Sequence, residues 1–155
     1  MFFQNREGGL RERRDMLREL YRIYEHKINT VDALLRARRR YAGEYPGAVA
    51  LLGELAAMQG AEMKKLSALL RDDALPSRLQ SRLEQQKGKP ASSTGTLLAY
   101  LHETAHGYRV AQQHYQALAS RALGTATRQL LLEFAQSAEE SADALERMHE
   151  RLECS

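Results

Sequence analysis

The chain has 155 residues, of which 43% are hydrophobic and 28% are charged, and its formal net charge is +3. This length fits one domain with a single sizeable core. Few residues are β-branched and no segment alternates apolar and polar residues for long, so the sequence excludes a β-sheet and predicts an all-α protein.

The first two predicted helices follow from apolar residues spaced three and four positions apart. The first helix spans about residues 10–41. It ends in the segment Gly43-Glu44-Tyr45-Pro46-Gly47, because proline cannot continue a helix but can begin the next one. The second helix spans about residues 46–74. The connection between them is short, so we expect the two helices to be antiparallel neighbours.

A long crossover and a second helical hairpin follow. Residues 75–93 form the crossover, which has room for a short helix over residues 78–86 and is much longer than a tight turn requires. The third helix spans about residues 94–123, with Thr94 as its predicted N-cap. A break at Gly124-Thr125 precedes the fourth helix, which spans about residues 125–152.

The apolar stripes of these four helices predict the core. Eight large side chains, two on each helix, should be substantially buried. They are Leu17, Tyr24, Leu52, Leu66, Leu101, Tyr108, Leu130 and Leu145.

Glu62 is the most informative residue for function, because the stripe of the second helix reaches Gln59 and Glu62 near its middle. A buried carboxylate must be paired, protonated or bound to a metal, since burying it alone costs several kcal/mol. A slight rotation that turns Met63 inward and leaves Glu62 at the edge explains the pattern equally well.

Other acidic residues also lie near the middle of the predicted helices. Glu25 lies on the first helix, Glu103 on the third with His106 one turn later, and Glu139-Glu140 on the fourth. Four bundle helices that each direct a carboxylate inward can hold two iron or manganese ions. The pattern therefore makes a di-metal site one candidate.

The two hairpins, the long crossover, Tyr24-Glu25, Glu62, Glu103 and Glu139-Glu140 together resemble the ferritin-like superfamily, in particular its small bacterial rubrerythrin-like members. The resemblance covers about residues 10–152. It implies a four-helix bundle in up-down-down-up order with a long crossover between the second and third helices. The metal-binding hypothesis uses Glu25, Glu62, Glu103, His106 and Glu140 as ligands, although in the family the third helix usually supplies only a carboxylate.

The sequence departs from this family at the second helix, where members with an active site carry Glu-x-x-His. Here the segment is Glu62-Met63-Lys64-Lys65, and the ammonium group of Lys65 can neutralise Glu62 without a metal. Our preferred prediction is a non-catalytic bundle without a cofactor that acts through self-association or protein partners. The alternative is an iron- or manganese-binding protein or oxidase.

The distribution of charge bears on partners. Residues 1–93 carry a net charge of +6 and residues 94–155 carry −3, so the two halves can attract each other inside the fold or between two copies. We expect a dimer. Acidic residues are interspersed among the arginines of the first helix, which argues against nucleic-acid binding. The sequence has no signal peptide, no membrane-spanning stretch and one cysteine, Cys154, and this combination predicts a cytoplasmic protein.

Overall fold

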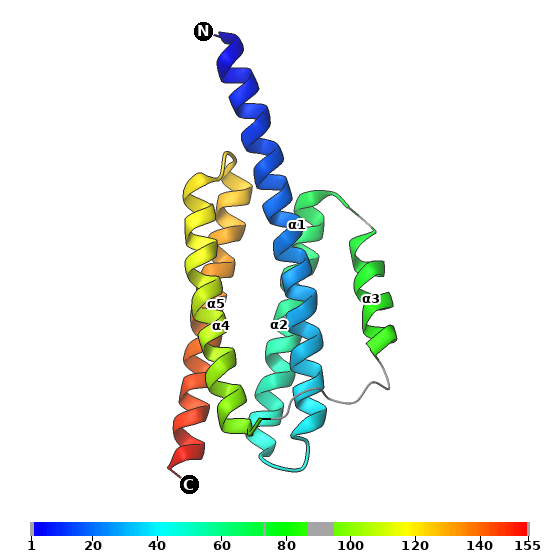
Figure 1. Cartoon of the computed structure of the whole chain (residues 1–155), viewed down its shortest axis with the longest axis vertical. Coiled ribbons are helices and arrows are strands. Elements are labelled where there is room, and N and C mark those ends of the chain that lie inside the picture. The colour runs from blue at the N-terminus through cyan, green and yellow to red at the C-terminus, as the bar shows by residue number, and fades with distance from the viewer. Residues whose placement is uncertain (1, 73, 87–94, 155) are drawn as a thin grey trace.

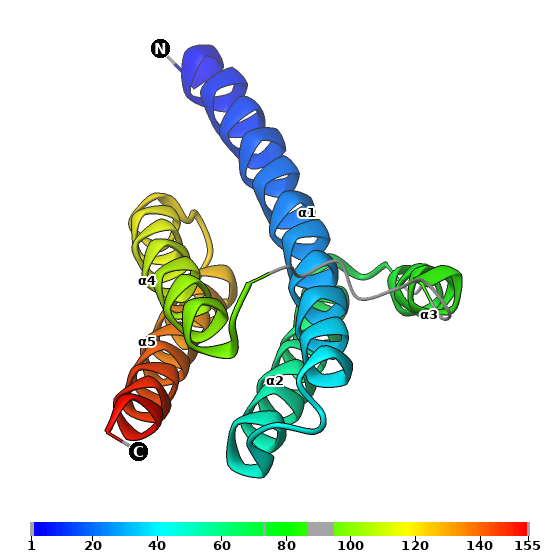
Figure 2. The same ribbon diagram turned by 60° about the horizontal axis from the view of Figure 1, so that its bottom comes forward.

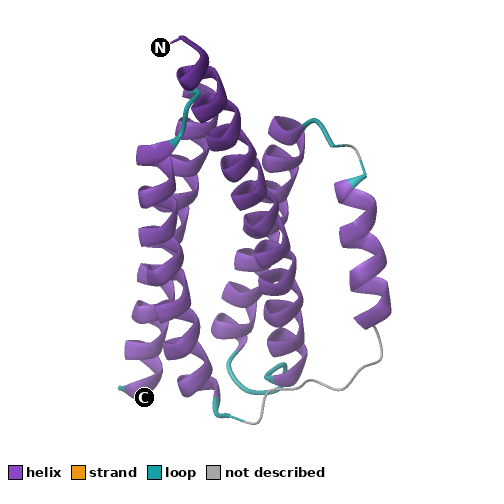
Figure 3. Ribbon diagram, turned by 45° about the horizontal axis from the view of Figure 1, so that its top comes forward, coloured by secondary structure: helices purple, strands orange, loops and turns teal. Residues whose placement is uncertain are grey.

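The computed structural model describes residues 2–72, 74–86 and 95–154, and all regular structure in this part of the chain is helical (Figure 3). Two long hairpins and one short helix make up the fold (Figure 1). The helices are α1 (Phe2–Arg40), α2 (Pro46–Leu70), α3 (Leu75–Gln86), α4 (Leu97–Arg121) and α5 (Thr125–Glu153). None of the described helices combines the length and the apolar character that a membrane span requires.

The four long predicted helices are confirmed, and their ends need correction. Helix α1 begins about eight residues before the predicted start. Thr94 lies outside the described residues, and the N-cap of α4 is Thr96, whose hydroxyl oxygen accepts a hydrogen bond from the amide of Ala99 at 3.1 Å. The predicted crossover contains α3, which starts three residues earlier than expected.

Helix α2 ends at Leu70 instead of residue 74 because the next residue, Arg71, adopts a left-handed conformation with φ 53°. This geometry lets the amide of Asp72 donate to the carbonyl oxygen of Ser67 at 3.2 Å, which closes the last turn. The Ser67 hydroxyl also donates to the Asp72 carbonyl oxygen at 2.9 Å. These bonds satisfy polar groups that the helix end would otherwise leave open.

The hairpins are joined by a crossover that returns the chain to the end at which α2 began. Helix α1 runs antiparallel to α2, and α4 runs antiparallel to α5, while α2 and α4 run in the same direction (Figure 1). The closest packing is within each hairpin, and α2 also contacts α5. Helix α3 lies beside the first hairpin, on the side away from α4 and α5 (Figure 2). The first turns of α1 continue beyond the end of the other helices.

One core runs through both hairpins, and seven of the eight predicted core residues are buried. Leu17 is the exception, because 47% of its surface is exposed. At this end of α1, Met16 and Leu20 are the residues that face the core. The predicted rotation of the helix about its own axis was therefore wrong at that end. Leu17 lies at the end of the bundle, in a groove that it shares with Leu69 and Leu123.

Candidate functional site

A buried ion pair lies at the centre of the molecule. Nζ of Lys27, on α1, is 3.5 Å from Oε1 of Glu62, on α2. The same ammonium group donates a hydrogen bond to Oε1 of Gln59 at 3.1 Å. Lys27 is 1% exposed and Glu62 is 9% exposed, so two charges are removed from water and must be balanced against each other. The sequence left open whether Glu62 or Met63 faces inward, and in the structure both are buried.

All four long helices contribute side chains that form or contact this ion pair. Nζ of Lys27 lies 4.2 Å from the ring centre of Phe134 on α5 and 5.1 Å from that of Tyr115 on α4. The electron-rich faces of these rings stabilise a cation. Ser137, on α5, donates a hydrogen bond to Oε1 of Glu62 at 3.4 Å. The network continues through Gln59, whose Nε2 donates to the hydroxyl oxygen of Tyr108 at 3.3 Å.

Burial opposes both charges of the pair. It lowers the pKa of Lys27 from its ordinary 10.5, and the neighbouring carboxylate counteracts that effect. Burial also raises the pKa of Glu62 above its ordinary 4.5, against the influence of Lys27. Oε2 of Glu62 is buried and has no hydrogen-bond partner among the described residues. The carboxylate therefore depends mainly on Lys27, which makes the pair sensitive to the loss of either partner.

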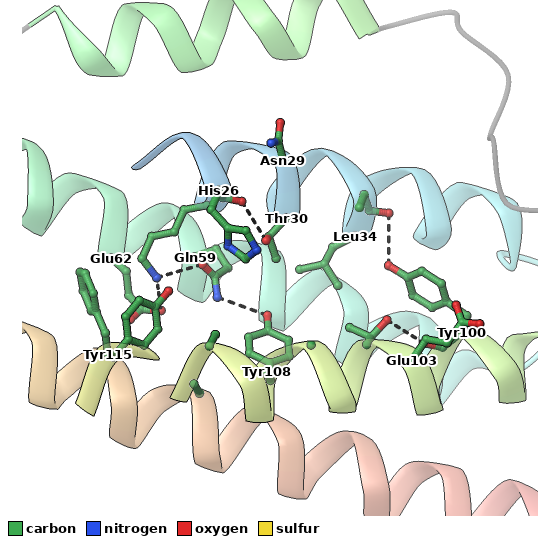
Figure 4. Close-up of a pocket in the computed structure, with 17 residues that line it drawn as sticks. His26, Asn29, Thr30, Leu34, Gln59, Glu62, Tyr100, Glu103, Tyr108 and Tyr115 are labelled. Atoms are coloured by element: carbon green, nitrogen blue, oxygen red, sulfur yellow. Dashed lines mark hydrogen bonds and ion pairs between the residues drawn. The ribbon is translucent and has the colours of Figure 1, made fainter. Parts of the chain in front are cut away.

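A groove opens above this network, between α1 and α4, with a cavity volume of about 310 Å³. We call it the α1/α4 groove. His26 and Thr30 of α1 face Tyr108 and Tyr115 of α4 across it (Figure 4). Partial removal from water lowers the pKa of His26 from its ordinary 6.5, with a smaller contribution from the charge of Lys27, although part of the residue is exposed at the mouth of the groove. The imidazole is therefore neutral at pH 7.

The structure brings only two of the five candidate metal ligands into this groove. Glu62 and Glu103 both line it, although Glu103 is exposed. Glu25 is exposed and pairs with Arg82 of α3 at 3.2 Å. His106 and Glu140 are also exposed. Among the described residues, no three His, Cys, Asp or Glu side chains are close enough together to hold a metal ion.

Lys65 is not the partner of Glu62, contrary to our expectation from the sequence. It is largely exposed and pairs with Glu133 of α5 at 3.5 Å. One turn of separation along α2 does not bring the two groups together, because Glu62 faces inward while Lys65 lies at the surface. Sequence reasoning missed Lys27, although the spacing Tyr24, Lys27, Val31, Leu34 places it on the buried stripe of α1.

The comparisons with known proteins show no relative. The sequence matches no model of a known protein family and no curated protein, and no solved structure matches the chain.

Proposed function

We propose that this chain is a ferritin-like, non-catalytic helical bundle of the cytoplasm that acts through self-association or protein partners. Two antiparallel hairpins joined by a long crossover support the fold assignment. The Lys27–Glu62 pair supports the non-catalytic assignment. In the resemblance described above, Glu62 would be a ligand at the metal centre, and here it already has a cationic partner.

The position of Lys27 is the observation that carries this proposal. An ammonium group 3.5 Å from a carboxylate oxygen competes with any metal ion for that oxygen and repels a second positive charge in the same low-dielectric space. Lys27 is held by Gln59 and by two aromatic rings, so it cannot leave without breaking these contacts as well. A di-metal centre at Glu62 would require its displacement.

We expect the protein purified without added metal to contain far less than one equivalent of iron or manganese per chain. Elemental analysis by mass spectrometry measures this directly. The alternative metal-binding function predicts one or two equivalents, which should be lost in Glu62→Gln and retained in the control Glu54→Gln, an exposed acidic residue on the same helix. That pattern would overturn the non-catalytic proposal.

The projecting part of α1 supports self-association. Leu10 and Leu17 lie seven residues apart, on the same face of the helix, and are 55% and 47% exposed. Leu17 also lines an apolar groove of about 340 Å³ at the end of the bundle, together with Met16, Leu20, Leu69, Leu70 and Leu123. Basic and acidic residues are interspersed along this segment of α1, so two antiparallel copies can pair opposite charges.

We expect light scattering to show a dimer, of about twice the 17.6 kDa chain mass. The double variant Leu10→Glu/Leu17→Glu should raise the dissociation constant by roughly 100-fold or more, because burying two carboxylates at an interface costs several kcal/mol. The control is Leu132→Glu on α5, since Leu132 is 49% exposed but lies outside the projecting segment. A wild-type monomer at high concentration and low salt, or equal effects of both variants, would contradict this interface.

A further inference from the structure

The α1/α4 groove exists because the two helices that border it belong to different hairpins. Helix α1 packs mainly on α2, and α4 packs mainly on α5. Where α4 faces the groove it carries the small residues Gly107 and Ala111. A Cβ atom placed on Gly107 would meet no atom within 4 Å. The space between α1 and α4 is therefore open, and its volume of about 310 Å³ lies at the lower end of the range for small-molecule sites.

Aromatic rings form much of the groove wall. Tyr100, Tyr108 and Tyr115 come from α4, and Phe134 comes from α5 (Figure 4). The aliphatic side chains of Leu34, Ala33 and Ala138 complete the apolar lining. Rings of this kind pack against a flat aromatic ligand in offset or edge-to-face arrangements, which adds to the free energy gained from burying apolar surface. The lining therefore favours an aromatic molecule.

The charges at the base of the groove cancel. The ammonium group of Lys27 is balanced by Glu62 at 3.5 Å, and the neighbouring His26 is neutral at pH 7 because burial lowers its pKa. A charged ligand would lose its hydration without gaining an opposite charge that is not already paired. The faces of Tyr115 and Phe134 that would attract a cation already hold the ammonium group of Lys27. Among the described lining residues, Glu103 at the rim also attracts a cation, but it is exposed to solvent, where its attraction is weak.

We propose that the α1/α4 groove binds a neutral aromatic molecule of one or two fused rings, which packs between the tyrosine rings above the Lys27–Glu62 pair. The hydroxyl groups of Tyr108 and Tyr115 lie at the groove and supply hydrogen bonds that orient a polar substituent of the ligand. This site is separate from the proposed dimer interface, because Leu17 lines a different groove at the end of the bundle and neither Leu10 nor Leu17 lines the α1/α4 groove.

Three matched probes test the charge preference: 2-naphthalenemethanol, 2-naphthylmethylammonium and 2-naphthoate. They share one ring system and differ in charge, from neutral to positive to negative. The chain contains no Trp, so naphthalene emission can be followed without tryptophan background. We expect the neutral probe to bind at one molecule per chain and about tenfold more tightly than either ion. Equal or tighter binding of an ion, or no saturable binding of the neutral probe, would overturn the proposal.

Gly107→Leu tests the location of the site, since Gly107 lines the groove and an added Cβ meets no atom within 4 Å, so a leucine side chain has room at this position. The matched control is Gly60→Leu, on α2, where an added Cβ also meets nothing within 4 Å and which lies outside the groove lining. We expect Gly107→Leu to weaken binding of the neutral probe by about tenfold or more, and Gly60→Leu to change it by less than about twofold. Thermal unfolding of both variants verifies that they are folded. Unchanged binding in a folded Gly107→Leu protein would place the probe elsewhere and reject this site.

Discussion

Replacement of Lys27 by Met should lower the free energy of unfolding by about 3–5 kcal/mol at pH 7. Methionine matches the length and apolar stem of lysine but leaves the Glu62 carboxylate without the ammonium group that now lies 3.5 Å away. The other oxygen of this carboxylate has no hydrogen-bond partner among the described residues, so the weak hydrogen bond from Ser137 and the charge of Lys65 at the surface would be left to stabilise it. Urea denaturation followed by circular dichroism measures the difference.

The loss in free energy of unfolding caused by Lys27→Met should depend on pH. Burial raises the pKa of Glu62, so the folded protein binds a proton more tightly than the unfolded chain does. Stability is therefore lost as pH rises from the unfolded value of about 4.5 through the folded pKa. Removing Lys27 takes away the charge that opposes the rise in the pKa of Glu62. The pH range over which stability is lost therefore becomes wider. The difference between variant and wild type should thus be largest near pH 7 and shrink below about pH 4.5, where Glu62 is protonated.

The double variant Lys27→Met/Glu62→Met separates the cost of an unpaired charge from the loss of packing. Both positions would then be apolar, and a buried ion pair replaced by hydrophobic residues of similar size often leaves stability equal or raises it by about 1–4 kcal/mol. We expect the double variant to recover most of the stability lost in Lys27→Met. A double variant as unstable as the single one, or a deficit independent of pH, would show that the charge of Glu62 is not the cause.

Local sequence signals located the long helices well. Pro46 begins α2, and Gly124 precedes α5 as its N-cap. The start of α1 and the end of α2 differ from the prediction, because they depend on contacts that the spacing of apolar residues does not reveal. Helix α2 stops early because Arg71 takes a left-handed conformation and Ser67 bonds to Asp72. The start of α1 extends beyond the other helices. Because that part of the helix does not pack on them, no apolar pattern marks the residue at which the helix begins.

The centre of the molecule was predicted only in part. The stripe of α2 indicated Gln59 and left open whether Glu62 or Met63 lies inside, and all three are buried, because a helical period of 3.6 allows neighbouring positions to share the inner face. The partner of Glu62 could not be read from α2 alone, since it comes from another helix. Lys27 follows Tyr24 by three residues on α1, next to Ile28, and both are buried; a charged residue at such a position is ordinarily expected at the surface.

The corrected rotation of α1 leads to a paired prediction for Leu52 and Leu17. Leu52 is fully buried between the helices, whereas 47% of the surface of Leu17 is exposed. Leu52→Ala should cost about 2–5 kcal/mol, because it removes buried methyl groups and leaves a cavity, and should lower Tm by roughly 4–20 °C for a chain of this size. Leu17→Ala should change the free energy of unfolding of the monomer by less than about 0.5 kcal/mol. The measurement belongs in the Leu10→Glu background, which weakens the proposed dimer and so isolates the effect on the monomer. Equal losses for the two alanine variants would mean that Leu17 is a core residue after all, and that α1 is rotated at this end relative to the structure.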